Sequence, residues 1–125
     1  MFDIVKHVAL WKEGAQESLD DAQYLINGGR VTLGLFALHL ALEKAIKAQI
    51  VEKTKEMPPR IHNLLTLANV VPLTLTPEQE RLLIELNTFN IRGRYPDMET
   101  KAPSRTQVES ILDLAKDVFE WLMRQ

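Results

Sequence analysis

Apolar residues recur at every third or fourth position along most of this chain, which is the period of an amphipathic α-helix. The first stretch with this period begins at Ile4 and reaches Ile26, and the Gly28-Gly29 pair follows it. Glycine commonly ends helices because it adopts the left-handed backbone conformation without strain. The pattern therefore predicts a first helix of about six turns. Its apolar stripe consists of Val8, Trp11, Ala15, Leu19, Ala22 and Ile26.

The second predicted helix runs from about Thr32 to Thr54, and its first half is apolar on nearly every side. A helix without a polar face must be covered from several directions. We therefore expect it to be the central helix of a bundle, or to face a second subunit as well. The apolar residues concerned are Leu33, Leu35, Phe36, Leu38, Leu40, Ala41 and Leu42.

Prolines and helix-capping residues divide the second half of the chain. Pro58-Pro59 stops the second helix, and a short third helix is predicted around Ile61 to Ala68, closed by Pro72. The segments Thr76–Gln79 and Ser104–Gln107 both have the capping-box pattern, in which a hydroxyl residue is followed three positions later by glutamine. Each of these two segments predicts the start of a further helix.

No segment has the sustained two-residue period of a strand, so the predicted fold class is all-α. Long helical segments with short connections favour an antiparallel up-and-down four-helix bundle, to which the third segment adds a short helix. The length of 125 residues, of which 46% are hydrophobic and 26% charged, suits one compact domain spanning residues 1–125.

Charge and cysteine content narrow the functional classes. The formal net charge is -2, so no overall cationic field attracts nucleic acid or a membrane, and a polyanion site has to be local. The chain has no cysteine, which excludes disulfides and thiolate chemistry and suits a cytoplasmic location. The most apolar stretch, Val31 to Leu42, is shorter than the roughly 20 residues that span a bilayer. The start, Met1-Phe2-Asp3, lacks the basic residues of a signal peptide.

A row of charged side chains interrupts the apolar second helix. His39, Glu43 and Lys47 are spaced by four residues and share a face, with Lys44 beside it. They form either an ordinary ion pair with a hydrogen-bonded core histidine, or a polar site that needs partners from elsewhere in the chain.

The other dense polar segment is the predicted loop from Arg92 to Pro103, which is long enough to be functional. We expect this loop to fold back onto the charged row. Arg92 and Arg94 could then grip a phosphate or carboxylate with two hydrogen bonds each, and Gly93 would allow close approach of the backbone. Alternatively, Arg94 bonds to a carboxylate of the row, that of Glu43, only to anchor the loop.

Pro96 bears on the order of this loop. It fixes its own backbone between Arg94 and Asp97, and it disfavours helical geometry at Tyr95. We therefore expect an ordered loop in which Arg94 and Asp97 contact the second helix.

Other sequence signals for chemistry are absent. The histidines at positions 7, 39 and 62 lack the spacing of metal ligands, and neither a glycine-rich phosphate loop nor a Gly-x-Ser-x-Gly elbow occurs. We therefore expect no metal ion and no cofactor. His62 is expected to face solvent or to cap the short helix, with Asn63 assisting.

The segment from Phe36 to Lys47, with its His, Ala and Glu-Lys-x-x-Lys pattern, resembles the second helix of the HEPN family, the higher eukaryotes and prokaryotes nucleotide-binding domains. Three further pieces are similar to the family in the same order, so the resemblance covers nearly the whole chain. They are Trp11 with Ala15, Asp21 and Ala22; Pro59 to Leu65 with His62; and Arg94-Tyr95-Pro96-Asp97, which resembles the Arg-Tyr-Pro-Asp of many small prokaryotic members.

The resemblance implies a bundle of four to five helices that forms a homodimer and is often encoded beside a minimal nucleotidyltransferase, in some cases as a toxin–antitoxin pair. Many HEPN toxins are metal-independent ribonucleases with an arginine followed four to six residues later by a histidine. No histidine follows Arg92 or Arg94 here, so the nuclease motif does not carry over. The residues that do carry over, as a polar ligand-binding site, are His39, Glu43, Lys44, Lys47, Arg92, Arg94, Tyr95 and Asp97.

These observations leave three functions open. The first is a dimeric module that binds a nucleotide, RNA or another polar ligand and acts as the partner of a minimal nucleotidyltransferase. The second is a metal-independent ribonuclease in which His39 or His62 transfers protons and Arg94 stabilises the developing charge. The third is a bundle without a ligand. The apolar second helix predicts a homodimer whose interface includes part of Val31 to Leu42 or the first helix.

Overall fold

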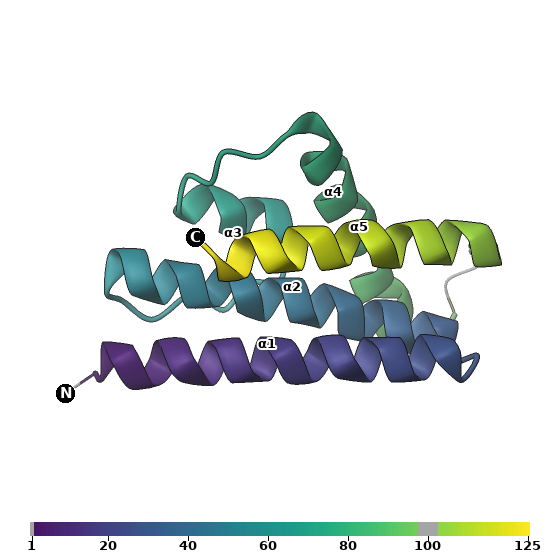
Figure 1. The fold of residues 1–125 in the computed structure, drawn as a ribbon, viewed down its shortest axis with the longest axis horizontal. Helices are drawn as coiled ribbons and strands as arrows, with labels where there is room; N and C mark the ends of the chain where they lie inside the picture. Colours follow the sequence, from purple (N-terminus) through teal and green to yellow (C-terminus); the bar gives the residue numbers. More distant parts are fainter. Residues whose placement is uncertain (1, 98–102) are drawn as a thin grey trace.

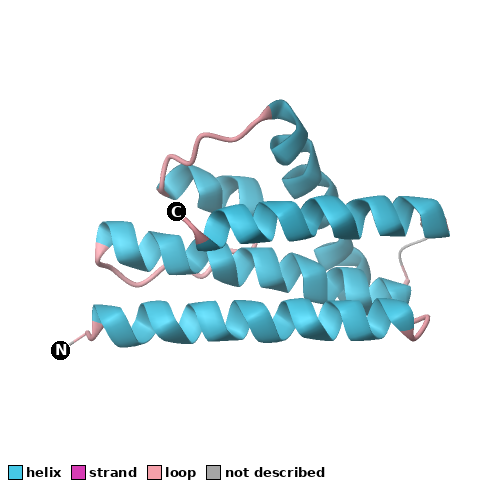
Figure 2. Cartoon of the chain, in the orientation of Figure 1, coloured by secondary structure: helices cyan, strands magenta, loops and turns pink. Residues whose placement is uncertain are grey.

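The computed structural model describes residues 2–97 and 103–125, and within these ranges it contains five helices and no strand (Figure 2). The all-α fold class and the short additional helix are therefore as predicted. The helices are α1 (Ile4–Asn27), α2 (Val31–Thr54), α3 (Leu64–Val70), α4 (Pro77–Arg94) and α5 (Arg105–Met123).

The bundle is built around α2, which packs against each of α1, α3, α4 and α5. In Figure 1, α1, α2 and α5 lie along the long axis of the molecule, whereas α4 is inclined steeply behind them. α1 runs opposite to α2, and α5 runs in the same direction as α2. The prediction that the second helix is the central one is confirmed. The side chains at its centre with no exposed surface include Leu38, Ala41, Leu42, Ala45 and Ile46.

Local capping chemistry sets the helix ends where the sequence predicted them. The Thr76 hydroxyl accepts from the Gln79 backbone amide and the Gln79 side chain accepts from the Thr76 amide, which completes the capping box of α4. Ser104 and Gln107 make the same two hydrogen bonds at α5. α1 ends before Gly28, and Gly29 follows in the left-handed conformation with φ +82°.

Close approach of α1 and α2 depends on a glycine near the start of α2. A Cβ atom at Gly34 would lie 2.6 Å from the Ile26 side chain and 3.3 Å from the carbonyl oxygen of Ala22. No larger side chain fits without moving the α1 backbone. Gly34 therefore helps to bring α1 down onto the central helix.

The predicted loop from Arg92 begins later than expected, because α4 continues to Arg94. Gly93 does not interrupt the helix, and it lies where a Cβ would come within 2.6 Å of the Phe36 ring on α2. The helix stops at Tyr95, whose extended backbone (φ -122°, ψ 91°) is the geometry expected before Pro96. Residues 98–102 of the predicted loop lie outside the described residues.

The other helices cover most of the apolar half of α2, but not all of it. Leu35 is only 1% exposed, and Leu38, Ala41 and Leu42 have no exposed surface. Leu33 is 52% exposed, and Phe36 and Leu40 are half-buried. That a dimer interface includes part of Val31 to Leu42 or the first helix stays a prediction. Within the described ranges, no helix has the length and hydropathy needed to cross a bilayer.

Candidate functional site

Polar side chains lie close together around Glu43, in the charged row of α2. We call this group the polar cluster; it joins α2 to the segment before α3 and to α4. Its members lie on α2, in the connection that follows it, or on the α2-facing side of α4. They are His39, Glu43, Lys47, His62 and Asn87.

Glu43 is the centre of the polar cluster. Its Oε2 atom accepts a hydrogen bond from the Lys47 ammonium at 3.0 Å, and both side chains are buried. His62 Nδ1 lies 3.1 Å from Oε2 and 3.2 Å from Oε1 of the same carboxylate. Because an ionised carboxylate only accepts hydrogen bonds, His62 donates its Nδ1 proton. The half-exposed imidazole of His62 therefore turns its Nε2 atom away from the carboxylate.

Asn87 connects the cluster to α3. Its side-chain oxygen accepts from the backbone amide of Leu64 at 3.0 Å, and its nitrogen donates to the Asn63 side chain at 3.2 Å. Asn63 in turn caps α3 by accepting from two backbone amides of its first turn, as the sequence predicted. This network fixes the orientation of the Asn87 amide.

The orientation of Asn87 decides the tautomer of His39. Its Nε2 atom lies 3.3 Å from the Asn87 oxygen, so Nε2 carries the proton that is donated. The Nδ1 atom has no hydrogen-bond partner among the described residues, is fully buried, and lies 3.7 Å from the Glu43 carboxylate. Burial lowers the pKa of His39 below its ordinary value of 6.5, and Glu43 only partly offsets this effect. His39 is therefore neutral at pH 7.

Lys44 points away from the polar cluster. Its ammonium donates to the Ser18 hydroxyl of α1 at 2.9 Å, and its methylene groups lie over Gly14. Lys47 also reaches α1, where its ammonium is 5.5 Å from the centroid of the Trp11 ring. The two lysines thus help to hold α1 against α2.

The arginines at the end of α4 do not reach the polar cluster. The Arg94 guanidinium lies over the Phe36 ring at 5.4 Å and donates to Asn90 at 3.3 Å. The expected contact of Arg94 with the second helix is confirmed, but its partner there is Phe36 and not Glu43. Tyr95 and Asp97 are exposed, and among the described residues no hydrogen bond or ion pair joins Asp97 to the second helix.

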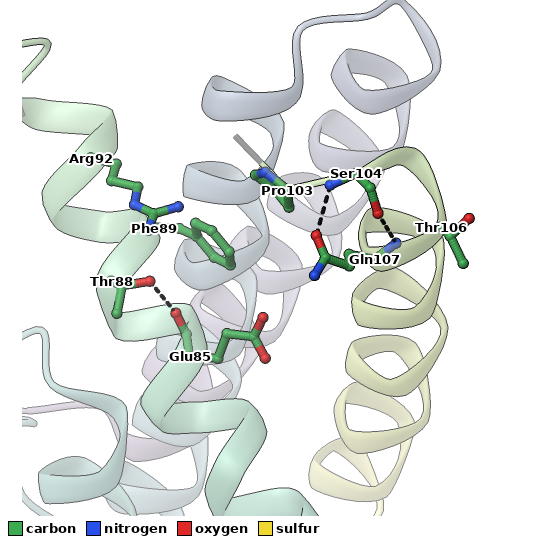
Figure 3. A pocket seen from close by; sticks show the side chains of 8 residues that line it. All are labelled: Glu85, Thr88, Phe89, Arg92, Pro103, Ser104, Thr106 and Gln107. Carbon is green, nitrogen blue, oxygen red and sulfur yellow. Dashed lines mark hydrogen bonds between the residues drawn. The ribbon is translucent and has the colours of Figure 1, made fainter. Parts of the chain in front are cut away.

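Arg92 lies at a cleft of about 720 Å³ between α4 and the start of α5. Its guanidinium is 5.3 Å from the centroid of the Phe89 ring. Figure 3 shows that Arg92, Phe89 and Glu85 project from α4 toward the first turn of α5. The cleft therefore offers a cation, an anion and an aromatic ring to a bound molecule. Its lining residues are Glu85, Thr88, Phe89, Arg92, Pro103, Ser104, Thr106 and Gln107.

The predicted site residues are therefore divided among separate places. The polar cluster takes His39, Glu43 and Lys47, whereas Arg92 belongs to the α4–α5 cleft. The arginines do not fold over the charged row as predicted, because they extend α4 and pack on aromatic rings instead. Sequence reasoning missed the roles of His62 and Asn87. Within the described part of the chain, no group of three His, Asp or Glu side chains is placed to hold a metal ion.

The fold and the polar cluster define an all-helical domain whose central helix carries a buried charged row. The sequence pattern of the HEPN domain matches residues 8–125, and the chain belongs to the HEPN domain family. Among solved structures, the crystal structure of TT1696 from Thermus thermophilus is similar, with a TM-score of 0.78 and 24% sequence identity. The likeness covers 94% of this chain and 96% of that chain, and at this identity it establishes the fold alone. No curated protein matches the chain.

Proposed function

We propose that this chain, acting as one domain, is a dimeric module that binds a nucleotide or a similar anionic ligand in the α4–α5 cleft. Membership of the HEPN family supports a nucleotide-binding or ribonuclease-like module. The observation that carries the proposal is the position of Arg92 over Phe89 at the cleft. We further propose that the module is cytoplasmic and serves a minimal nucleotidyltransferase as its partner, as in toxin–antitoxin pairs.

The cleft has the chemistry that a nucleotide needs. The Arg92 guanidinium can donate two parallel hydrogen bonds to a phosphate, and its stacking on Phe89 limits its motion. Glu85 accepts hydrogen bonds from a hydroxyl or an amino group, as a ribose or a base would offer. Thr106 and Gln107 add neutral donors from α5. A small anion with hydroxyl groups therefore fits this cleft better than an apolar ligand does.

Equilibrium binding of a fluorescently labelled ATP to the purified chain tests the ligand proposal. Arg92→Gln removes the charge at the cleft and should weaken binding by about tenfold or more, which is the usual effect of losing a charge-assisted pair of hydrogen bonds. Arg94→Gln is the matched control, because the same charge is lost two residues away over Phe36. Equal losses in both variants, or no binding at all, would contradict the assignment of the cleft.

The partner proposal has its own experiment. A minimal nucleotidyltransferase encoded next to this chain should co-purify with it when the two are expressed together. A mixture that separates fully during size-exclusion chromatography at micromolar concentration would contradict the partner role and leave the ligand proposal intact.

A second candidate function, metal-independent ribonuclease, is favoured by one contact. His62 donates its Nδ1 proton to the buried Glu43 carboxylate, so Nε2 is held in the form that accepts a proton. A base positioned in this way could deprotonate a ribose 2′-hydroxyl. The arginines of α4 that would stabilise the phosphate pack against Phe36 and Phe89, away from this histidine.

We therefore expect little or no cleavage of single-stranded or structured RNA in the presence of EDTA, which excludes metal-dependent contaminants. Robust cleavage that is lost in His62→Ala and retained in His7→Ala would establish the ribonuclease instead of the binding module. Intact RNA together with ATP binding that depends on Arg92 would support the binding module.

A further inference from the structure

The proposed function gives no role to the polar cluster, although that cluster holds two of the three histidines of the chain. A buried carboxylate kept beside titratable groups is costly, and such arrangements are often found at functional sites. The three histidines differ in the exposure of the ring and in the partner of its Nδ1 atom. This difference indicates a reaction that is open to His62 and closed to the other two.

His39 and His7 are poorly placed to react with a molecule from solution. His39 has no exposed surface, and its ring lies between the Asn87 side chain and the Glu43 carboxylate. His7 is half-buried, and its ring packs against that of Phe2, with the two centroids 4.4 Å apart. Among the described residues, no carboxylate forms an ion pair with His7. Neither ring therefore combines access from solvent with a carboxylate hydrogen-bonded to its Nδ1 atom.

His62 has both properties. Its side chain is 52% exposed, and its Nδ1 atom donates to the Glu43 carboxylate at 3.1 Å. That hydrogen bond keeps the proton on Nδ1, so the lone pair of the ring is on Nε2, which is turned away from the carboxylate. Glu43 is itself buried and is held by the Lys47 ammonium at 3.0 Å. The nucleophilic nitrogen of His62 is therefore held in a fixed direction.

Glu43 also favours bond formation at Nε2. When Nε2 forms a bond to an electrophile, the imidazole ring gains a positive charge, and a carboxylate hydrogen-bonded to Nδ1 stabilises that charge. The effect is strong here because burial of Glu43 limits competition from water for the same oxygen atoms. The pair thus has the arrangement of an activated histidine nucleophile.

The surroundings of His62 favour an anionic reagent. The connection from 55 to 63 that carries it contains Lys55 and Arg60 and a single acidic residue, Glu56. This local excess of positive charge attracts anions and disfavours cations. An acyl group on an imidazole nitrogen is hydrolysed quickly, whereas a phosphoryl group on that nitrogen persists in neutral and alkaline water. Charge and chemistry together therefore select a phosphoryl donor.

We propose that Nε2 of His62 accepts a phosphoryl group, which makes this residue a histidine phosphorylation site. The donor is a phosphorylated compound with a good leaving group, such as an acyl phosphate or a phosphoramidate. The Nε2 lone pair forms a bond to phosphorus while the bond from phosphorus to the leaving group breaks, and the leaving group keeps that electron pair. The Nδ1 proton stays on the ring, hydrogen-bonded to Glu43. This reaction differs from ribonuclease chemistry, in which the histidine only transfers protons.

Phosphoramidate, a small reagent that phosphorylates histidine, tests the proposal on the full chain in mildly alkaline buffer. Mass spectrometry of the intact protein and of its peptides measures the rate at each histidine. We expect His62 to react at least about tenfold faster than His7, which is the effect of one hydrogen bond to a charged group. The phosphoryl group should be lost in acid and retained in base, as expected for phosphorus bound to nitrogen and not to a hydroxyl oxygen.

Exposure alone could also make His62 reactive, and Val5→His is the matched control for it. Position 5 is 81% exposed, which is more than His62. The acidic side chain near it in the sequence, that of Asp3, caps α1 by accepting from the Lys6 amide. His62 should still react at least about tenfold faster than the histidine at position 5. Equal rates at the two positions would overturn the proposal.

Glu43→Gln tests the role of the carboxylate, and it should lower the rate at His62 to that at position 5. Circular dichroism at low temperature shows whether this variant is folded. If it unfolds, the unaltered chain in urea replaces it: the ratio of the His62 rate to the His7 rate should then fall to about one, because both rings are free of the fold. A ratio that survives unfolding would contradict activation by Glu43. ATP binding to the α4–α5 cleft does not enter these measurements, so phosphorylation of His62 in a chain that fails to bind ATP would contradict the proposed function alone.

Discussion

His62 Nδ1 lies 3.1 Å from the Glu43 carboxylate, although the two residues are nineteen positions apart. The contact fastens the connection between α2 and α3 to the central helix. It also supplies Glu43 with a second donor beside the Lys47 ammonium. A buried carboxylate is stable only when such partners replace its lost water, so the members of the cluster depend on one another.

Glu43→Gln should therefore destabilise the protein strongly. The substitution leaves the buried Lys47 ammonium without its anion, and breaking one side of a buried pair costs about 3 kcal/mol or more. Urea denaturation followed by circular dichroism measures this change. Glu109→Gln is the matched control, because its pair with Arg105 is exposed and contributes little. Equal stability of the two variants would show that the ion pair in the cluster is unimportant.

Stability should fall as the pH is lowered below about 6.5, because of His39. Burial lowers its pKa in the folded state, while the unfolded chain keeps the ordinary value of 6.5. Between these two values the unfolded state binds more protons, so the free energy of unfolding decreases as the pH falls. The stabilisation is complete above the unfolded-state pKa and is lost progressively toward the lowered one.

Denaturation curves measured from pH 7.5 to pH 5.5 test this dependence. His39→Gln keeps a donor for Asn87 but removes the titrating ring, so its stability should vary less over the interval. Glu43 and His62 remain in both proteins, so whatever they contribute is common to the two sets of curves. A slope unchanged by the substitution would assign the pH dependence to other groups.

Local rules explain why most of the fold could be predicted. Helix periods, the two capping boxes and the glycine pair after α1 depend on neighbours within a turn, and the sequence contains those neighbours. The extent of α4 is different, because the continuation of the helix through Gly93 depends on its packing against Phe36, which is more than fifty residues away. The sequence does not reveal that contact, so from the sequence alone Gly93 is predicted to lie in a loop.

The candidate site was predicted only in part for the same reason. His39, Glu43 and Lys47 share a helix face by spacing alone, so their proximity was predictable. His62 reaches them because of the path of the chain between α2 and α3. Asn87 reaches them because of the tilt of α4. No local pattern specifies either feature. Arg94 is a possible partner of Glu43 in the sequence analysis, but its side chain lies over the Phe36 ring instead.

Gly34→Ala should lower stability by about 2 kcal/mol, the usual cost of an overpacked contact. Its Cβ atom would lie 2.6 Å from the Ile26 side chain and 3.1 Å from the Ile26 backbone nitrogen. Gly14→Ala is the control within α1, where the nearest atom is the flexible Lys44 side chain at 3.4 Å. That substitution should stabilise the helix by about 0.5–1 kcal/mol. Thermal denaturation distinguishes the two, and a shift of the same sign in both would refute close packing at Gly34.

Leu35→Asp should unfold the protein, whereas Leu33→Asp should leave it folded. Leu35 is 1% exposed on the side of α2 that faces the core, and a carboxylate placed there has no partner to replace its lost water. Leu33 is 52% exposed, so an aspartate at that position stays hydrated. Circular dichroism reports the fold of each variant, and sedimentation velocity reports its mass. If α2 formed the dimer interface through Leu35, Leu35→Asp would instead give a folded monomer, which is the outcome that contradicts the burial of Leu35 in the core of the single chain.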